Sequence, residues 1–97
     1  NHEGLLDPAL WRRFDDVVEF GRPTVHEIRQ LLRLRLRSIP SHQVDLEGAA
    51  SKLQGYPHAA AEFAVWEAFR AVLLDGRSEI TAADLHAAVE RTRQRPW

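Results

Sequence analysis

The sequence predicts a small, mainly α-helical domain with four substantial helices, one short leading helix and one short strand. Two observations support this fold class. The 97-residue chain is 44% hydrophobic and 28% charged, which is enough apolar material for one core and argues against disorder. Four apolar segments also follow residues that start helices, namely Thr24, Asp45, Pro57 and Thr81.

Composition excludes several classes of function. The chain has no cysteine, so it can form neither a disulfide scaffold nor a thiol-based catalytic or zinc site. No apolar run approaches the ~20 residues that span a bilayer, and the first residues lack the pattern of a signal peptide. We therefore expect a cytoplasmic protein without membrane contact. The net charge of −1 argues against general attraction to nucleic acid.

Residues 1–23 are expected to hold the leading helix and the strand. Asp7 is a favoured N-cap, and Pro8 suits the first helical position. The β-branched residues Val17 and Val18 then predict a short strand, which ends at Gly21.

Two adjacent arginines, Arg12 and Arg13, lie between this helix and this strand. A planar, permanently charged guanidinium can donate two hydrogen bonds to phosphate oxygens, so a phosphate site is one interpretation. The other interpretation is that both are surface residues at a helix C-terminus, where they interact favourably with the helix dipole.

The first substantial helix is expected from Thr24 to about Arg37. Thr24 and Glu27 form a capping box, which outweighs the strand-like alternation of leucine and arginine in residues 32–37. On a helix, Arg35 falls inside the apolar arc. We therefore expect it to point inward and to need a carboxylate or carbonyl partner, or to lie at a site.

Three further helices follow from the same kind of signal. Asp45 caps a helix over residues 46–54, which Gly55 ends. The longest helix spans residues 58–75 and ends at Gly76. The last helix begins after Thr81 and runs to about residue 93.

The long helix is apolar on nearly all sides, because only Glu62, Glu67 and Arg70 are polar between Ala59 and Leu74. A helix of this type is covered on most sides. It is either the central helix of a compact bundle or in contact with a partner through its surplus apolar surface.

Charge is unevenly distributed along the helices. Residues 24–43 contain four arginines against one glutamate, whereas residues 44–75 contain five acidic residues against two basic ones. Opposite faces of opposite sign suit docking against another protein. Solvated helix faces explain the same pattern.

A search for catalytic motifs finds none within the chain. The five histidines show no metal-ligand spacing, so no metal site is expected. The sequence contains neither a nucleophile elbow with a catalytic triad nor a phosphate-binding loop.

Several motifs nevertheless resemble one family. The opening segment is similar to the second region of homology of AAA+ ATPases over residues 1–15, which read Asn1-His2-Glu3-Gly4-Leu5-Leu6-Asp7-Pro8-Ala9-Leu10-Trp11-Arg12-Arg13-Phe14-Asp15. Three later segments resemble, in the same order, parts of the helical lid of that family: Asp45-Leu46-Glu47-Gly48-Ala49, Gly55-Tyr56-Pro57-His58-Ala59 and Ile80-Thr81-Ala82-Ala83-Asp84-Leu85. The resemblance covers nearly the whole chain.

This resemblance implies two parts, with residues 1–23 at the end of the AAA+ core and residues 24–97 as the helical lid domain. It also implies that ATP and Mg²⁺ bind the intact parent protein, which hydrolyses ATP and forms a homo-oligomeric ring. In this scheme Asn1 is the sensor-1 asparagine, and Arg13, or else Arg12, is an arginine finger. The ATP-facing residues of the lid are Gly55, Tyr56, Pro57, His58 and Ala59. The phosphate loop and the acidic magnesium strand belong to a core domain that this segment lacks, so the segment alone is expected to be inactive.

The sequence also departs from the family pattern. Many members separate two arginines by two residues, whereas Arg12 and Arg13 are adjacent, which leaves the choice of finger open. No arginine follows Gly55 in the next turn, so a sensor-2 arginine is absent. Pro57 replaces the usual small hydroxyl residue, which is acceptable because the first helical position needs no N–H.

An alternative function is a stand-alone helical module that binds protein or nucleic acid. Arg29, Arg33 and Arg37 lie roughly together on one helix and could follow a phosphate backbone. The acidic remainder of the chain argues against nucleic acid, so we expect this segment to bind none.

Overall fold

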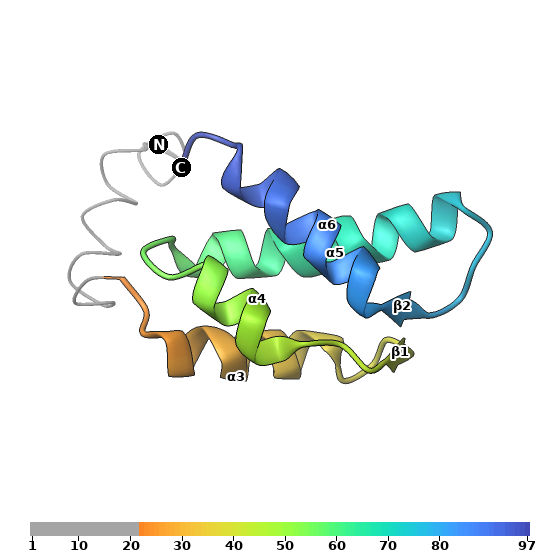
Figure 1. Ribbon diagram of the computed structural model, residues 1–97, viewed down its shortest axis with the longest axis horizontal. Helices are drawn as coiled ribbons and strands as arrows, with labels where there is room; N and C mark the ends of the chain where they lie inside the picture. Colours follow the sequence, from red (N-terminus) through yellow and green to blue (C-terminus); the bar gives the residue numbers. More distant parts are fainter. Residues whose placement is uncertain (1–21) are drawn as a thin grey trace, which may run out of the picture.

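The computed structural model describes residues 22–97, which form four α-helices and one small parallel sheet (Figure 1). The elements are α3 (Val25–Leu36), β1 (Ser41–His42), α4 (Leu46–Lys52), α5 (His58–Leu74), β2 (Ile80–Thr81) and α6 (Ala82–Arg93). The mainly α-helical fold class and the four predicted helices are confirmed. The predicted leading helix and the strand at Val17 and Val18 lie outside the described residues.

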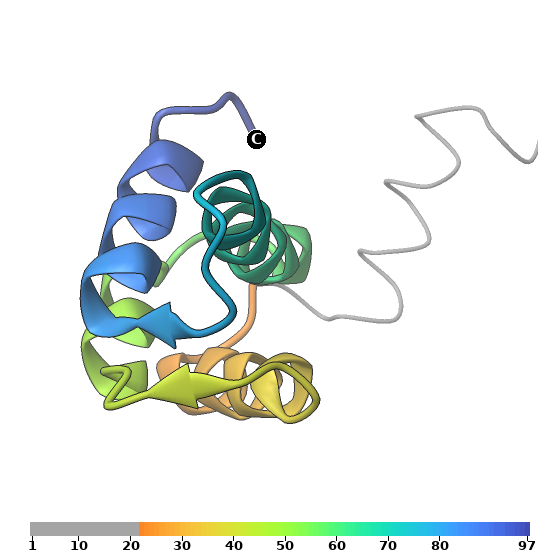
Figure 2. The same ribbon diagram turned by 90° about the vertical axis from the view of Figure 1, so that its right-hand side faces the viewer.

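The helices pack in the cyclic order α3, α4, α6 and α5. Figure 2 shows α4 and α6 on one side of the domain, with α3 and α5 beside them. β1 and β2 pair in parallel, with Ser41 opposite Ile80 and His42 opposite Thr81. The Ile80 N–H also donates to the Pro40 carbonyl at 2.9 Å. This small sheet, which the sequence analysis did not predict, joins the first helix pair to the second at one end.

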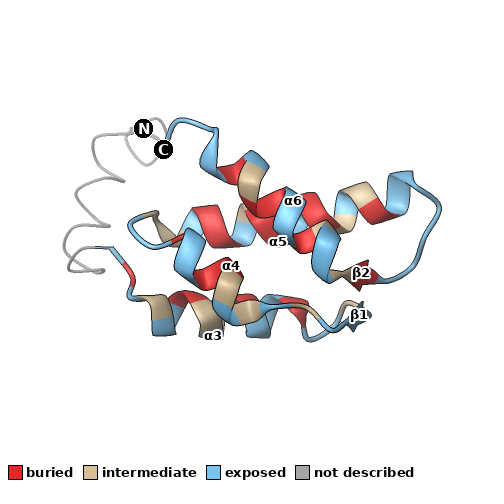
Figure 3. Cartoon of the chain, viewed as in Figure 1, coloured by how far each residue is buried: buried red, intermediate tan, exposed pale blue. Residues whose placement is uncertain are grey.

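The predicted capping box of α3 is present. Thr24 Oγ1 accepts from the Glu27 N–H at 3.1 Å, and Glu27 Oε1 accepts from the Thr24 N–H at 2.8 Å. These bonds fix a helical start, so the strand-like leucine and arginine alternation has no effect on the fold. Ile28, Leu32 and Leu36 then recur on one buried face (Figure 3).

The expected inward orientation of Arg35 is wrong, although its expected carboxylate partner exists. The Arg35 side chain is 51% exposed, and its Nε donates to Glu62 Oε2 of α5 at 2.9 Å. Its long stem follows the edge between α3 and α5 while the charged end stays in solvent. The apolar arc of α3 is therefore narrower than the sequence pattern indicates.

Helix α5 contributes small residues to the core, where Ala61, Ala64 and Ala68 are almost fully buried. Because alanine adds little bulk, α3 and α6 can approach the α5 backbone closely. Larger apolar side chains of the other elements fill the space around these alanines. They include Ile28, Leu32, Leu53, Ile80, Leu85 and Val89.

The two glycines that are predicted to end helices have the left-handed backbone conformation that favours glycine. Gly55 has φ +89° and Gly76 has φ +74°. After α5, the Gly76 N–H donates to the Leu73 carbonyl at 3.0 Å and the Arg77 N–H to the Val72 carbonyl at 2.9 Å. This pattern is a Schellman motif, which satisfies carbonyl groups at the end of the helix.

The segregated charges seen in the sequence pair with one another at the surface of the domain. Arg29 of α3 pairs with Glu47 of α4 at 2.9 Å, and Arg35 pairs with Glu62 of α5. Part of the positive charge of residues 24–43 is therefore balanced by the acidic residues that follow. Arg29 is thus engaged, which weakens the alternative of a phosphate-binding arginine stripe on α3.

The connection from α5 to α6 is held by an arginine–aspartate pair. Arg77 donates from both terminal nitrogens to the Asp84 carboxylate at 2.9 and 2.7 Å, and from Nε to Asp75 at 2.7 Å. Asp84 also accepts from the Thr81 N–H at 2.8 Å, as part of the capping box of α6. The hydrogen bonds from Arg77 hold the pKa of Asp84 well below its usual range and outweigh the opposing effect of burial.

Replacing Asp84 tests this connection. We expect Asp84→Asn to lower the free energy of unfolding by about 1–2 kcal/mol at neutral pH. The reason is that the substitution weakens both the cap of α6 and the bidentate ion pair with Arg77. Since the folded pKa lies below the unfolded value, the stabilisation is present above about pH 4 and is lost as the pH falls. Urea unfolding of both proteins across this range measures the difference.

Asp75→Asn is the matched control, because its exposed carboxylate contacts the same arginine but caps no helix. Its expected cost is below about 0.5 kcal/mol. Two results would contradict the role given to Asp84. The first is an equal loss of unfolding free energy in the two variants. The second is a difference in unfolding free energy between Asp84→Asn and the unmodified chain that stays constant as the pH falls.

Candidate functional site

The five predicted nucleotide-facing residues form the connection between α4 and α5. Leu53 ends α4, and the Tyr56 N–H donates to its carbonyl at 3.0 Å. Gly55 then reverses the chain in the left-handed conformation. Pro57 is the N-cap of α5 with extended backbone angles, φ −72° and ψ 165°. The structure thus brings Gly55 to Ala59 together in one corner at the start of α5.

Helix α5 starts differently from the other described helices. The N-termini of α3, α4 and α6 are capped by the side chains of Thr24, Asp45 and Thr81. Pro57 makes no side-chain capping bond, and the first turn of α5 contains no acidic residue. An uncapped N-terminus keeps the positive end of the helix dipole available to an anion. This difference fits a site for phosphate groups.

Tyr56 connects this corner to the end of α6. Its hydroxyl donates to the Arg93 carbonyl at 3.4 Å, a long hydrogen bond. Tyr56, Pro57 and His58 are half-buried, whereas Gly55 and Ala59 are exposed. The corner is therefore joined to the end of α6 through Tyr56, and two of its five residues are exposed to solvent.

A buried carboxylate that sequence reasoning missed fixes α5 against α6. Glu67 accepts from Arg91 Nε at 3.0 Å and from Arg70 Nε at 3.4 Å. Burial alone would raise the pKa of Glu67, but the two arginines outweigh it and hold the pKa below its usual value. The sequence did contain a signal for this contact. Glu67 lies between Ala64 and Ala68 on an apolar helix, and an acid that is buried there needs a partner.

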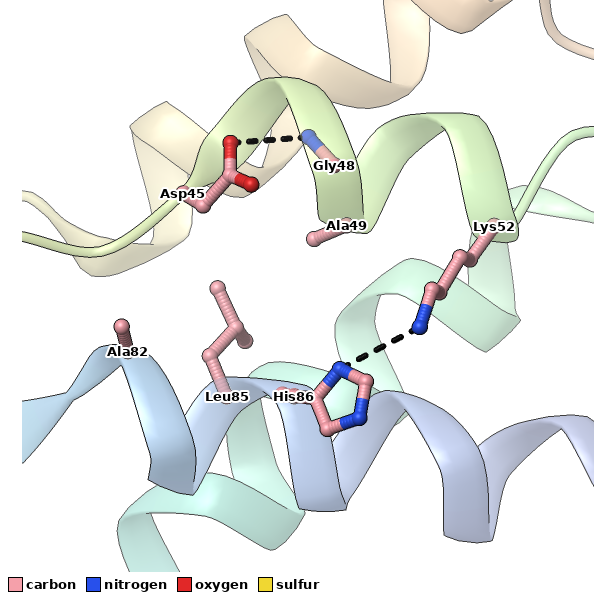
Figure 4. A pocket seen from close by; sticks show the side chains of 7 residues that line it. All are labelled: Asp45, Gly48, Ala49, Lys52, Ala82, Leu85 and His86. Atoms are coloured by element: carbon pink, nitrogen blue, oxygen red, sulfur yellow. Dashed lines mark hydrogen bonds between the residues drawn. The ribbon is translucent and has the colours of Figure 1, made fainter.

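A concave region lies between α4 and α6 (Figure 4). This groove of about 230 Å³ is lined by Asp45, Gly48, Ala49, Lys52, Ala82, Leu85 and His86. Lys52 Nζ lies 3.3 Å from His86 Nδ1 and 3.4 Å from Glu90 Oε2. The charge of Lys52 is therefore already engaged within the domain.

The predicted catalytic residues Asn1, Arg12 and Arg13 lie outside the described residues. Within residues 22–97, no group of three or more histidine, aspartate or glutamate side chains could hold a metal ion. In the same part of the chain, no helix is long and apolar enough to cross a membrane.

The described residues thus form a small helical lid-type domain whose long helix begins at an open, uncapped corner. No family model matches the chain. Over 95 residues, 98% of its length, it is 30% identical to an uncharacterized AAA family ATPase of Sinorhizobium fredii. It is 35% identical over 94 residues to proteasome-activating nucleotidase 2 of Haloferax volcanii. It is 39% identical over 94 residues to the ATP-dependent zinc metalloprotease FtsH 3 of Sphaerobacter thermophilus.

These relatives are much longer than the chain, which spans 28%, 23% and 19% of their respective lengths. The chain is therefore related, over nearly its whole length, to one segment of AAA family ATPases. Its resemblance to the C-terminal part of AAA+ ATPases is confirmed.

A substitution that adds a side-chain cap to α5 tests whether the missing cap lowers the stability of the domain. If the added cap raises stability, the native N-terminus is uncapped for a reason other than stability. We expect Pro57→Asp to raise the free energy of unfolding by about 0.5 kcal/mol. A new cap contributes about 1 kcal/mol, and the loss of proline rigidity offsets roughly half of it. Urea unfolding measures the change.

Asp45→Ala, which removes an existing cap from α4, is the comparison and should cost about 1 kcal/mol. A loss above about 1 kcal/mol in Pro57→Asp would show instead that the proline itself supports the corner.

Proposed function

We propose that this chain is the lid segment of an AAA+ ATPase. In this proposal, the corner of Gly55 to Ala59 contributes to ATP binding, and the helical domain couples nucleotide state to subunit movement. The observation that carries the proposal is the relation to AAA family ATPases over nearly the whole chain. The uncapped N-terminus of α5, at the segment that resembles the family's ATP-facing turn, supports it.

The corner would contact the nucleotide through its backbone and its shape, rather than through a charged side chain. Its first helical turn has no arginine, so the positive end of the α5 dipole would supply the attraction to phosphate. Tyr56 and Pro57 would border the adenosine. The Mg²⁺ that accompanies ATP would be held by residues of a core domain.

The internal ion pairs would let the helical domain move as one body. Glu67 joins α5 to Arg91 of α6, and the Arg35–Glu62 pair joins α5 to α3. A displacement at the N-terminus of α5 is then passed to neighbouring helices instead of being lost in local rearrangement. This rigidity is what a lid needs in order to transmit nucleotide state.

Arg13 would act as an arginine finger on the ATP of the neighbouring subunit in a ring, with Arg12 as the second candidate. Support comes from the similarity of residues 6–15 to the second region of homology. A guanidinium in this position stabilises the charge of the transferring phosphoryl group. The isolated segment is expected to hydrolyse no ATP, because the phosphate loop and the acidic magnesium strand would belong to the core domain.

Substitution of the two arginines in the ATPase that contains this segment tests the finger. We expect Arg13→Ala to lower the turnover number by ~10³-fold or more, while ATP affinity changes by less than about threefold. Steady-state hydrolysis and equilibrium nucleotide binding measure the two quantities. Arg12→Ala is the matched control, and turnover close to that of the unmodified enzyme in Arg13→Ala would remove the assignment.

The corner is tested separately in the same ATPase. We expect Pro57→Asp to weaken ATP binding by about tenfold, because a carboxylate at the start of α5 repels phosphate and occupies the helix N-terminus. Pro57→Ala, which adds neither charge nor cap, is the control. Unchanged ATP affinity in Pro57→Asp would show that the corner does not contact the phosphates.

A further inference from the structure

An aromatic cluster with two arginines lies on the outer side of α5 and on the C-terminal segment. We call it the aromatic face and define it by Phe63, Trp66, Arg70, Arg95 and Trp97. The ring centre of Phe63 lies 6.0 Å from that of Trp66 and 5.9 Å from that of Trp97. In Figures 1 and 2, the segment after α6 turns back over the N-terminal half of α5.

The aromatic face is held in place although much of it is exposed. Trp97 Nε1 donates to the Thr92 carbonyl at 2.8 Å, which fixes the ring of Trp97 against the end of α6. Trp66 is nevertheless 55% exposed and Trp97 is 41% exposed. Two large rings that are exposed to solvent beside a third ring are typical of a surface that another molecule covers.

Positive charge surrounds these rings. The Arg95 guanidinium lies 4.2 Å from the ring centre of Phe63, and that of Arg70 lies 5.6 Å from the ring centre of Trp66. Arg70 and Arg91 share one buried carboxylate, Glu67. Arg95 has no carboxylate partner within residues 22–97. The cations around the aromatic face therefore exceed the acids.

The stacking geometry indicates which kind of partner fits. A stacked guanidinium covers the face of a ring but leaves its own N–H edge free to donate to an oxygen anion. Because Arg70 and Arg95 already lie over the rings of Trp66 and Phe63, these rings offer less open face for a nucleic-acid base to stack on. Carboxylates can still reach the guanidinium edges, and aliphatic side chains can pack on the exposed rings.

We propose that the aromatic face is a docking site for an acidic, leucine-containing segment of a partner protein. Its carboxylates bind the N–H edges of Arg70 and Arg95, and its leucines pack on the exposed parts of Trp66 and Trp97. This interaction is separate from the proposed nucleotide corner, since none of the five residues of the aromatic face belongs to that corner. It goes beyond ATP binding, because it assigns a protein partner to the lid surface.

The test uses the 97-residue chain and a fluorescein-labelled peptide of alternating glutamate and leucine pairs. We expect saturable binding by fluorescence anisotropy that weakens as salt is added. The NMR signals of the Trp66 and Trp97 indole N–H groups should shift during the titration. Arg95→Gln should weaken binding by about fivefold and Trp66→Ala by about tenfold, while circular dichroism shows that both variants remain folded.

Two control variants and two control ligands make the outcome decisive. Arg33→Gln removes an exposed arginine from α3, and Leu74→Ala removes an exposed leucine from the far end of α5. Neither should change the affinity. The proposal is overturned if a peptide with glutamine in place of glutamate binds equally well, or if Arg33→Gln weakens binding as much as Arg95→Gln. It is also overturned if an oligothymidylate binds more tightly than the acidic peptide, or if the chain self-associates through Trp66 and leaves the peptide unbound.

Discussion

The packing of α5 against α3 and α6 is the constraint on which the rest of the domain depends. Ala61, Ala64 and Ala68 are buried there, and their small side chains let two helices approach the α5 backbone from different sides. Larger residues such as Leu32 and Leu85 then complete the core. Because α5 is held along much of its length, its N-terminus has a fixed direction relative to α3 and α6.

Ion pairs are placed at the edges of this core rather than within it. The Arg35–Glu62 pair lies between α3 and α5, and the Arg77–Asp84 pair lies at the connection from α5 to α6. Among residues 22–97, Glu67 is the one charged residue in a buried position, and two arginines pair with it. The pairs therefore join neighbouring helices at the edges of the core.

Local signals in the sequence predicted the helices well. The capping residues Thr24, Asp45 and Thr81 and the terminating residues Gly55 and Gly76 act within one helical turn, so neighbouring residues alone decide their effect. The ends of the predicted helices differ by one or two residues from those observed, because the last turns depend on packing. The corner from Gly55 to Ala59 was found through its resemblance to a family motif, and the structure adds that its helix is uncapped.

The sequence by itself determined where the helices start, where they end to within two residues, and the relation to AAA family ATPases. Tertiary structure decided the pairing of β1 with β2, the exposure of Arg35, the two arginine partners of Glu67 and the gathering of Phe63, Trp66 and Trp97 on one face. Most of these features join residues far apart in the chain, such as Ser41 with Ile80, Glu67 with Arg91, and Phe63 with Trp97. Their distances follow from how the helices pack, and no periodicity within a single helix records that information.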